Sequence, residues 1–211
     1  LLPSPDVFDH VIARVELAGR SYYLDPTRLG QRGQLSRMGL PLEGAKGLPV
    51  RADTTDLITV SASNALELAT TEVREVLTLE ALDGDGRLDV RRSWNGATAE
   101  VLRVAFGRLT IEQQRSQATA DYERRYPGIT LDGEPRIVDD LARNTFTLEA
   151  KYKLPKPAKE LNGDWAVRFF PTNLAGAINL PQKMARKFPA TVTTSPYQAQ
   201  YQLIVNWYCA W

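Results

Sequence analysis

The stretch FDHVIARVELAGRSYYLDPT, residues 8–27, has the pattern of two β-strands joined by a tight turn. In its first half, apolar and polar side chains alternate with the period of two that is typical of a strand. Ala18-Gly19-Arg20 is a short turn of the kind that joins antiparallel strands. A turn that is symmetric about Ala18 and Gly19 places position 10 opposite position 27. His10 and Asp25 then become diagonal neighbours on one face of the hairpin.

His10 is the only histidine of the chain, and an aspartate beside it has a specific chemical use. An Asp carboxylate accepts a hydrogen bond from the imidazole, fixes its tautomer and stabilises its charged form beside a thiolate. His10 and Asp25 would therefore be the orienting half of a nucleophile–His–Asp triad. The spacing alone also allows a strand-end histidine and an Asp-Pro-Thr turn without contact. A register slipped by one residue would place the two side chains on opposite faces.

The same residues resemble the His–Asp segment of the transglutaminase-like superfamily. The closest likeness is to the bacterial cell-envelope group, in which a papain-like catalytic core is flanked by β-rich domains of unknown function. His10 matches the family histidine that begins a strand, and Asp25 matches the aspartate that follows an aromatic-Leu pair. The resemblance covers about residues 5–50 and continues loosely to the end, including Arg186-Lys187-Phe188-Pro189. It implies a cysteine enzyme of the periplasm or cell envelope that hydrolyses or cross-links amides of a protein or peptide.

The family nucleophile is a cysteine at a helix start that precedes the histidine. The single cysteine here is Cys209, which follows a strand pattern, so we do not expect it to be catalytic. Only nine residues precede His10, so we expect this chain to be a C-terminal part of such a protein, inactive by itself. The alternative is a non-catalytic β-rich binding or scaffolding module of the cell envelope, in which His10 and Asp25 are structural.

The composition limits the possible partners and cofactors. The 211 residues are 43% hydrophobic and 24% charged, which is ordinary for a globular protein. A net charge of +1 gives no global attraction to nucleic acid or to an anionic membrane surface. No apolar run approaches the roughly 18–20 residues that span a bilayer, so we expect no membrane insertion by this segment. One cysteine and one histidine argue against a disulfide framework, a metal site or a bound cofactor. The oligomeric state is left open.

The rest of the chain predicts an α+β fold: a mainly antiparallel sheet with one or two helices packed on one face. The hairpin from the transglutaminase-like core precedes it, followed by a surface loop over residues 28–48. Helices are expected over 97–109 and from Thr110, an N-cap with Gln113 three residues on, to about Tyr126. Strand patterns occur at 57–60, 72–80, 87–94, 146–154, 165–170 and 197–207. We divide the chain into residues 1–50, the catalytic remnant, and residues 51–211, a β-rich accessory domain that folds by itself.

Three further motifs have ordinary structural interpretations. Asp83-Gly84-Asp85-Gly86 lacks the spacing of a calcium loop and is better explained as a hairpin turn with positive φ at glycine. The lysines at 151, 153, 156 and 159 favour a solvated strand edge over a site for an acidic partner. Core packing is favoured over a sugar-stacking platform for the large aromatic side chains of Trp94, Trp165, Tyr201 and Trp207.

Overall fold

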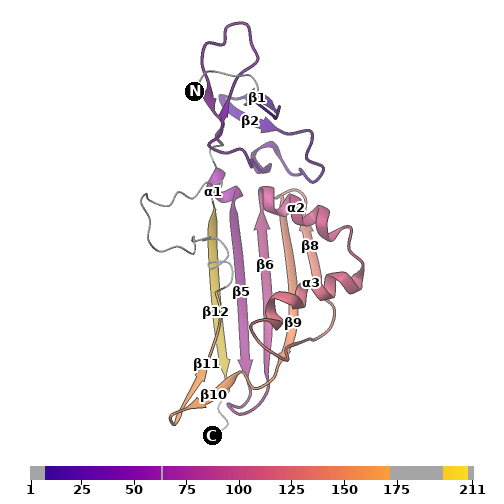
Figure 1. Ribbon diagram of the computed structural model, residues 1–211, viewed down its shortest axis with the longest axis vertical. Coiled ribbons are helices and arrows are strands. Elements are labelled where there is room, and N and C mark those ends of the chain that lie inside the picture. The colour runs from indigo at the N-terminus through magenta and orange to yellow at the C-terminus, as the bar shows by residue number, and fades with distance from the viewer. Residues whose placement is uncertain (1–7, 63, 172–196, 209–211) are drawn as a thin grey trace.

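The computed structural model describes residues 8–62, 64–171 and 197–208, and its centre is a six-stranded sheet (Figure 1). The strand order is β12-β5-β6-β9-β7, with β8 also pairing with β9. The strands of this sheet are β5 (Thr70–Leu79), β6 (Gly86–Asn95), β7 (Thr130–Leu131), β8 (Arg136–Asp140), β9 (Thr145–Leu154) and β12 (Gln198–Trp207). All neighbours are antiparallel except β12, which pairs in parallel with β5, so the described sheet is mainly antiparallel, as we expected.

Two helices cover one face of this sheet, which confirms the α+β architecture (Figure 1). Helix α2 (Gly96–Phe106) lies against β6 and β9, and α3 (Ile111–Glu123) follows it. Thr110 and Gln113 form the predicted capping box, in which the Thr110 hydroxyl accepts from the Gln113 N–H and the Gln113 side chain accepts from the Thr110 N–H. Both helices end three residues earlier than the pattern predicted. A one-turn helix, α1 (Ala65–Leu68), precedes β5.

The side-chain alternation of β9 separates the two faces of the sheet. Phe146, Leu148, Ala150, Tyr152 and Leu154 are buried under the helices. Their neighbours Lys151 and Lys153 lie exposed on the opposite face, and Lys153 pairs with Asp132 there at 3.3 Å. Lys151 and Lys153 are thus solvated, as predicted, but β9 pairs with β6 on one side and with β7 and β8 on the other, so they do not lie on the strand edge that we expected. One-sided burial is the arrangement that an antiparallel strand with this pattern is expected to adopt.

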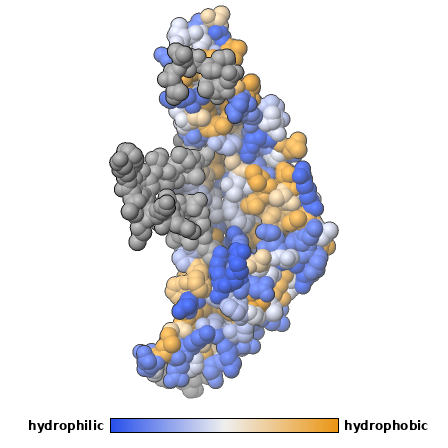
Figure 2. All heavy atoms as spheres, in the orientation of Figure 1, coloured by the Kyte–Doolittle hydropathy of each residue, from blue (hydrophilic) through white to orange (hydrophobic). Residues whose placement is uncertain are grey.

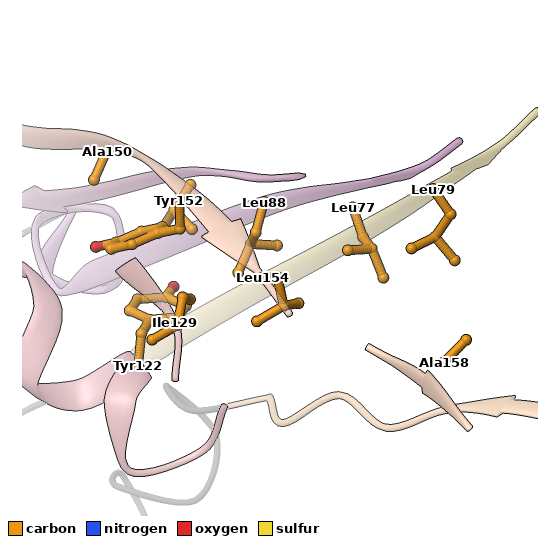
Figure 3. Packing of buried hydrophobic residues seen from close by; sticks show 10 residues of the cluster. Leu77, Leu79, Leu88, Tyr122, Ile129, Ala150, Tyr152, Leu154 and Ala158 are labelled. Atoms are coloured by element: carbon orange, nitrogen blue, oxygen red, sulfur yellow. The ribbon is translucent and has the colours of Figure 1, made fainter. Parts of the chain in front are cut away.

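The core consists of two clusters of buried apolar side chains. Figure 3 shows the larger cluster, in which the ring of Tyr122 from α3 stacks on Tyr152 of β9 with ring centroids 5.1 Å apart. The Tyr152 hydroxyl donates to the Ala118 carbonyl at 2.7 Å, so the buried phenol is satisfied. The smaller cluster contains Trp94, Ala99, Phe106, Ala118, Phe146 and Leu148. Every member of both clusters lies beyond residue 50, so the accessory region holds a core of its own.

Small two-stranded sheets flank the central sheet at both ends (Figure 1). At the N-terminal end are the hairpin of β1 (Ala13–Leu17) and β2 (Arg20–Leu24), the 3-10 helix η2 (Leu35–Arg37), and the pair β3 (Lys46–Gly47) and β4 (Ile58–Thr59). At the other end β10 (Ala158–Leu161) pairs with β11 (Asp164–Val167). β4 and β11 are shorter than the strands that the sequence predicted.

The stretch that we expected to be a surface loop, residues 28–48, is in part buried against α2. Gly30 and Gly39 lie so close to this helix that a Cβ atom would come within 2.3 Å of the Glu100 carbonyl oxygen and 2.2 Å of the Ala97 nitrogen, respectively. Only glycine permits this approach of two backbones. The surface-loop prediction was therefore wrong for this part, because close packing of backbone leaves no periodic pattern of side chains to detect.

Polar contacts hold the loop in this place. The Glu100 carboxylate pairs with Arg28 at 2.8 Å and accepts from the Gly39 N–H at 2.9 Å and from the Asn144 amide at 2.7 Å. Arg103, one turn further along α2, donates to the Gly30 carbonyl at 2.9 Å and pairs with Asp139 at 2.8 Å. The loop is thus tied to α2 by two charged side chains from that helix.

Two other expectations need correction. Neither Gly84 nor Gly86 has positive φ, so the turn after β5 does not use glycine for its backbone freedom. Gly86 is buried instead, and a Cβ atom there would lie 2.9 Å from the Pro157 ring. Among the large aromatic side chains, Trp94 lies in the core, whereas Trp165 and Trp207 are about half exposed.

Among the helices that the structure describes, none is long and apolar enough to cross a lipid bilayer.

The position of the core allows a test of the division at residue 50, which stays a prediction. We predict that deleting residues 1–48 leaves a folded protein, because both core clusters remain intact. It should melt about 5–10 °C lower, since the Arg28–Glu100 and Gly30 contacts are lost. Thermal unfolding followed by circular dichroism, beside the full chain, measures this. Loss of the cooperative transition would show that the hairpin and the loop are integral to a single folding unit.

Candidate functional site

His10 and Asp25 meet beside the hairpin, as their spacing predicted. The imidazole Nε2 of His10 lies 2.8 Å from Oδ2 of Asp25. The register of the hairpin pairs Ala13 with Leu24 and Leu17 with Arg20, so its continuation places position 10 opposite position 27. His10 and Asp25 therefore share a face, just beyond the ends of β1 and β2. The interpretation without contact between them was wrong.

The turn of the hairpin fixes this register. Ala18 and Gly19 both have positive φ, +50° and +75°, which is the geometry of a two-residue type I′ turn. The Leu17–Arg20 pair closes directly around it. A loop of one residue more would shift β2 by one position and turn Asp25 to the opposite face from His10.

Asp25 is nearly buried, with 9% of its surface exposed, and its oxygens are hydrogen-bonded. Oδ1 accepts from the Thr27 N–H at 3.1 Å and from the Thr27 hydroxyl at 2.6 Å, while Oδ2 faces His10. Burial acts to raise the pKa of Asp25, but the hydrogen bonds from Thr27 and His10, together with the attraction of the imidazole charge, outweigh it and lower the pKa below its usual value. Asp25 is thus an anion at neutral pH.

The ionised carboxylate determines which imidazole nitrogen is available for chemistry. A carboxylate accepts hydrogen bonds and has none to donate, so the proton between the two groups belongs to Nε2 of His10. Nδ1 of the neutral ring then carries the free lone pair. Among the described residues nothing is hydrogen-bonded to Nδ1, and the side chain is 36% exposed. His10 can therefore take a proton through Nδ1 while Asp25 stabilises the resulting cation.

The described residues bring together a histidine and an aspartate, two of the three residue types of a nucleophile–His–Asp triad. Cys209 and the segment Arg186-Lys187-Phe188-Pro189 lie outside the described residues. No cysteine occurs in the described part of the chain, so the nucleophile of such a triad would have to come from elsewhere. Within that same part, no cluster of three or more histidine, cysteine, aspartate or glutamate side chains is arranged to hold a metal ion.

Sequence reasoning missed two residues that support Asp25. Thr27 could have been found, because an Asp followed two positions later by a donor is the pattern of an Asx turn. Gln31 accepts a hydrogen bond from the Asp25 N–H at 3.3 Å. It lies in the aperiodic loop, where no sequence signal marks it.

A cavity of about 280 Å³ lies next to the site, between β2, η2 and α1. Tyr23 lines this cavity on one side and, on the other, a small hollow that Asp25 also lines. Arg37 and Glu67, which form an ion pair, both line the cavity.

The opposite face of the hairpin is apolar and open in the described structure. Val11 is 80% exposed, and Val15 and Leu17 are also exposed. Hydrophobic residues are visible on the surface at this end of the molecule in Figure 2. The two faces of the hairpin thus differ in kind, since the His10–Asp25 face is polar and the other is a strip of aliphatic side chains.

Comparison of the chain with models of protein families, with characterised proteins and with solved structures gives no match. The resemblance to the transglutaminase-like superfamily therefore stays a prediction from the sequence.

The lowered pKa of Asp25 predicts a pH dependence of stability. A carboxyl whose pKa is lower in the folded state than in the unfolded state stabilises the fold above its unfolded pKa, and this contribution is lost as pH falls through the folded pKa. We predict that Asp25→Asn lowers the free energy of unfolding by about 1.5–3 kcal/mol at pH 7. The difference from the unmodified chain should shrink below pH 4. Urea unfolding of the two proteins at pH 7 and at pH 3 measures this difference.

The control for this measurement is Asp9→Asn, which removes an exposed carboxylate next to His10 in sequence. It should leave the stability unchanged at both pH values. A difference for Asp25→Asn that is the same at pH 7 and pH 3 would contradict the assignment of an ionised, hydrogen-bonded Asp25.

Proposed function

We propose that this chain supplies the acid–base half of a thiol-dependent acyl-transfer site of the transglutaminase-like type. The substrate would be an amide of a protein or peptide in the bacterial periplasm or cell envelope. The observation that carries the proposal is the 2.8 Å contact between Nε2 of His10 and a nearly buried Asp25, with no described residue hydrogen-bonded to Nδ1. The β-rich region beyond residue 50 would support this half-site.

In this function each group has a defined step. A thiol from outside the described residues transfers its proton to Nδ1 of His10, and the thiolate attacks the amide carbonyl. The imidazolium, stabilised by Asp25, gives the proton to the leaving amine as the carbon–nitrogen bond breaks. The thioester that remains is then opened by water, which gives hydrolysis, or by an amine, which gives a cross-link. In that second step His10 takes a proton from the water or the amine, the carbon–sulfur bond breaks, and the proton returns to the departing sulfur, which restores the thiol.

A small thiol in solution allows the proton-transfer role to be tested on the chain as it is. With p-nitrophenyl acetate and N-acetylcysteamine, sulfur attacks the ester, p-nitrophenolate leaves and a thioester forms. We predict that the chain accelerates this thiol-dependent release and that His10→Ala removes the acceleration. Asp25→Asn should lower the thiol-dependent rate about tenfold. This effect is smaller than the factor of about 10²–10⁴ in rate that a general base contributes when its nucleophile is fully positioned. Absorbance of p-nitrophenolate, with and without thiol, measures the rate.

Asp9→Asn is again the matched control, because it removes a neighbouring charge without touching the hydrogen bond to His10. Its rate should equal that of the unmodified chain. If His10→Ala retains the full thiol-dependent rate, the imidazole is not acting as a base. The non-catalytic binding or scaffolding function would then be the better account.

A second prediction concerns amide substrates of the kind that the proposed function would use. The described residues contain no thiol to accept an acyl group, so we predict no turnover of a peptide amide or a glutamine donor by this chain alone. Amine incorporation and ammonia release are the two measurements. Turnover that Cys209→Ala abolishes would overturn this prediction and make Cys209 the nucleophile.

A further inference from the structure

Asp25 and Arg28 are the two ends of one tight turn. The Arg28 N–H donates to the Asp25 carbonyl at 3.1 Å, which closes the turn. Inside it, the backbone and the hydroxyl of Thr27 both donate to Oδ1 of Asp25. The Asp25 carboxylate is thereby fixed relative to the backbone of Arg28, and any force that places Arg28 also places the group that orients His10.

Arg28 is itself held from the accessory region. Its guanidinium pairs with the Glu100 carboxylate at 2.8 Å and donates to the carbonyls of Gly39 at 3.2 Å and Ala97 at 3.4 Å. The Glu100 side chain is 1% exposed and that of Arg28 is 16% exposed, so little water competes for this ion pair. Among the described residues Glu100 is the only carboxylate that pairs with Arg28.

Glu100 is in turn immobilised by the helix that carries it. Its neighbour Ala99 is fully buried in the core cluster that also contains Phe106 and Trp94. The second carboxylate oxygen accepts from the Gly39 N–H and the Asn144 amide, which fixes the orientation of the side chain. A continuous series of contacts therefore runs from the core through Glu100, Arg28 and Asp25 to His10.

From these contacts we infer that Glu100 and Arg28 are positioning residues for the His10–Asp25 pair, so that the β-rich region sets the geometry of the half-site. The functional meaning of this positioning role rests on the proposed acid–base function. The positioning itself rests on the contacts alone. Glu100, far from His10 along the chain, would thus help to position the His10–Asp25 pair. No sequence pattern around Glu100 indicates this role.

The single histidine makes a direct test possible. In a ¹⁵N-labelled chain the hydrogen-bonded Nε2–H of His10 gives one imidazole signal, whose exchange with water reports how firmly Asp25 holds the ring. We expect Glu100→Gln to speed this exchange roughly tenfold, because the charge that holds Arg28 is removed. Arg28→Lys keeps the positive charge but loses the planar guanidinium and its several donors, so we expect an intermediate effect.

Glu75→Gln is the matched control for the same substitution. Glu75 is as buried as Glu100, but it lies on β5 and accepts from the hydroxyls of Tyr122 and Tyr201, with no contact to the loop. The Glu75→Gln variant should have a lower melting temperature and an unchanged rate of exchange of the His10 Nε2–H. If Glu100→Gln does not fold, Arg28→Lys carries the test.

Two results would overturn the inference: a folded Glu100→Gln or Arg28→Lys variant with the exchange rate of the unmodified chain, or the same acceleration in Glu75→Gln. Neither result depends on turnover. Accelerated exchange together with a His10→Ala variant that keeps the full thiol-dependent rate would uphold the positioning role and refute the proposed function. If exchange is not accelerated but His10→Ala loses the thiol-dependent rate, only the positioning role is refuted.

Discussion

Burying the Glu100 carboxylate removes its hydration, and the structure surrounds the carboxylate instead with one cation and two hydrogen-bond donors from two separate segments. Arg28 and Gly39 come from the loop after the hairpin, and Asn144 from the residue before β9. A buried charge that loses its partner is strongly destabilising, whereas the intact pair adds little net stability. The pair therefore acts as a constraint on geometry, because the loop must lie where Arg28 reaches the buried carboxylate of Glu100 on α2.

The hairpin contributes a second constraint, which is its strand register. Side chains on a strand alternate between two faces, so the length of the Ala18-Gly19 turn decides whether His10 and Asp25 face each other. This constraint is local and leaves the hairpin free to lie anywhere relative to the sheet. The contact to Glu100 removes that freedom. Together the two constraints fix both the geometry of the His10–Asp25 pair and its placement against α2.

The elements that could be predicted from the sequence are those with local signals. The alternation of residues 146–154, the capping box of Thr110 and Gln113, and the hairpin register all depend on neighbours a few positions apart. The contact between His10 and Asp25 followed from that register. Sequence patterns of this kind therefore predicted the long strands β5, β6, β9 and β12, the start of the second helix and the His10–Asp25 contact, but not β7, β8 or β10.

The features that could not be predicted depend on residues far apart in the chain. The docking of the loop uses Gly30 and Gly39, whose value is the absence of a side chain, and Arg28, which meets a partner on a helix far along the sequence. The parallel pairing of β12 with β5 is a property of strand order, and alternation within a strand does not encode it. The φ angles after β5 were mispredicted because Gly86 is needed for close packing.

The parallel β12–β5 pair also has a kinetic consequence. Thr70 meets Gln198, a partner 128 residues away, whereas β5, β6 and β9 are joined by antiparallel pairings of shorter sequence separation. Loop closure over so long a segment is slow, so the antiparallel strands are able to assemble first on the ribosome. Until β12 arrives, one edge of β5 presents unpaired backbone groups to other nascent chains. The period between the synthesis of β5 and the docking of β12 is therefore the interval in which this protein is most exposed to misassembly.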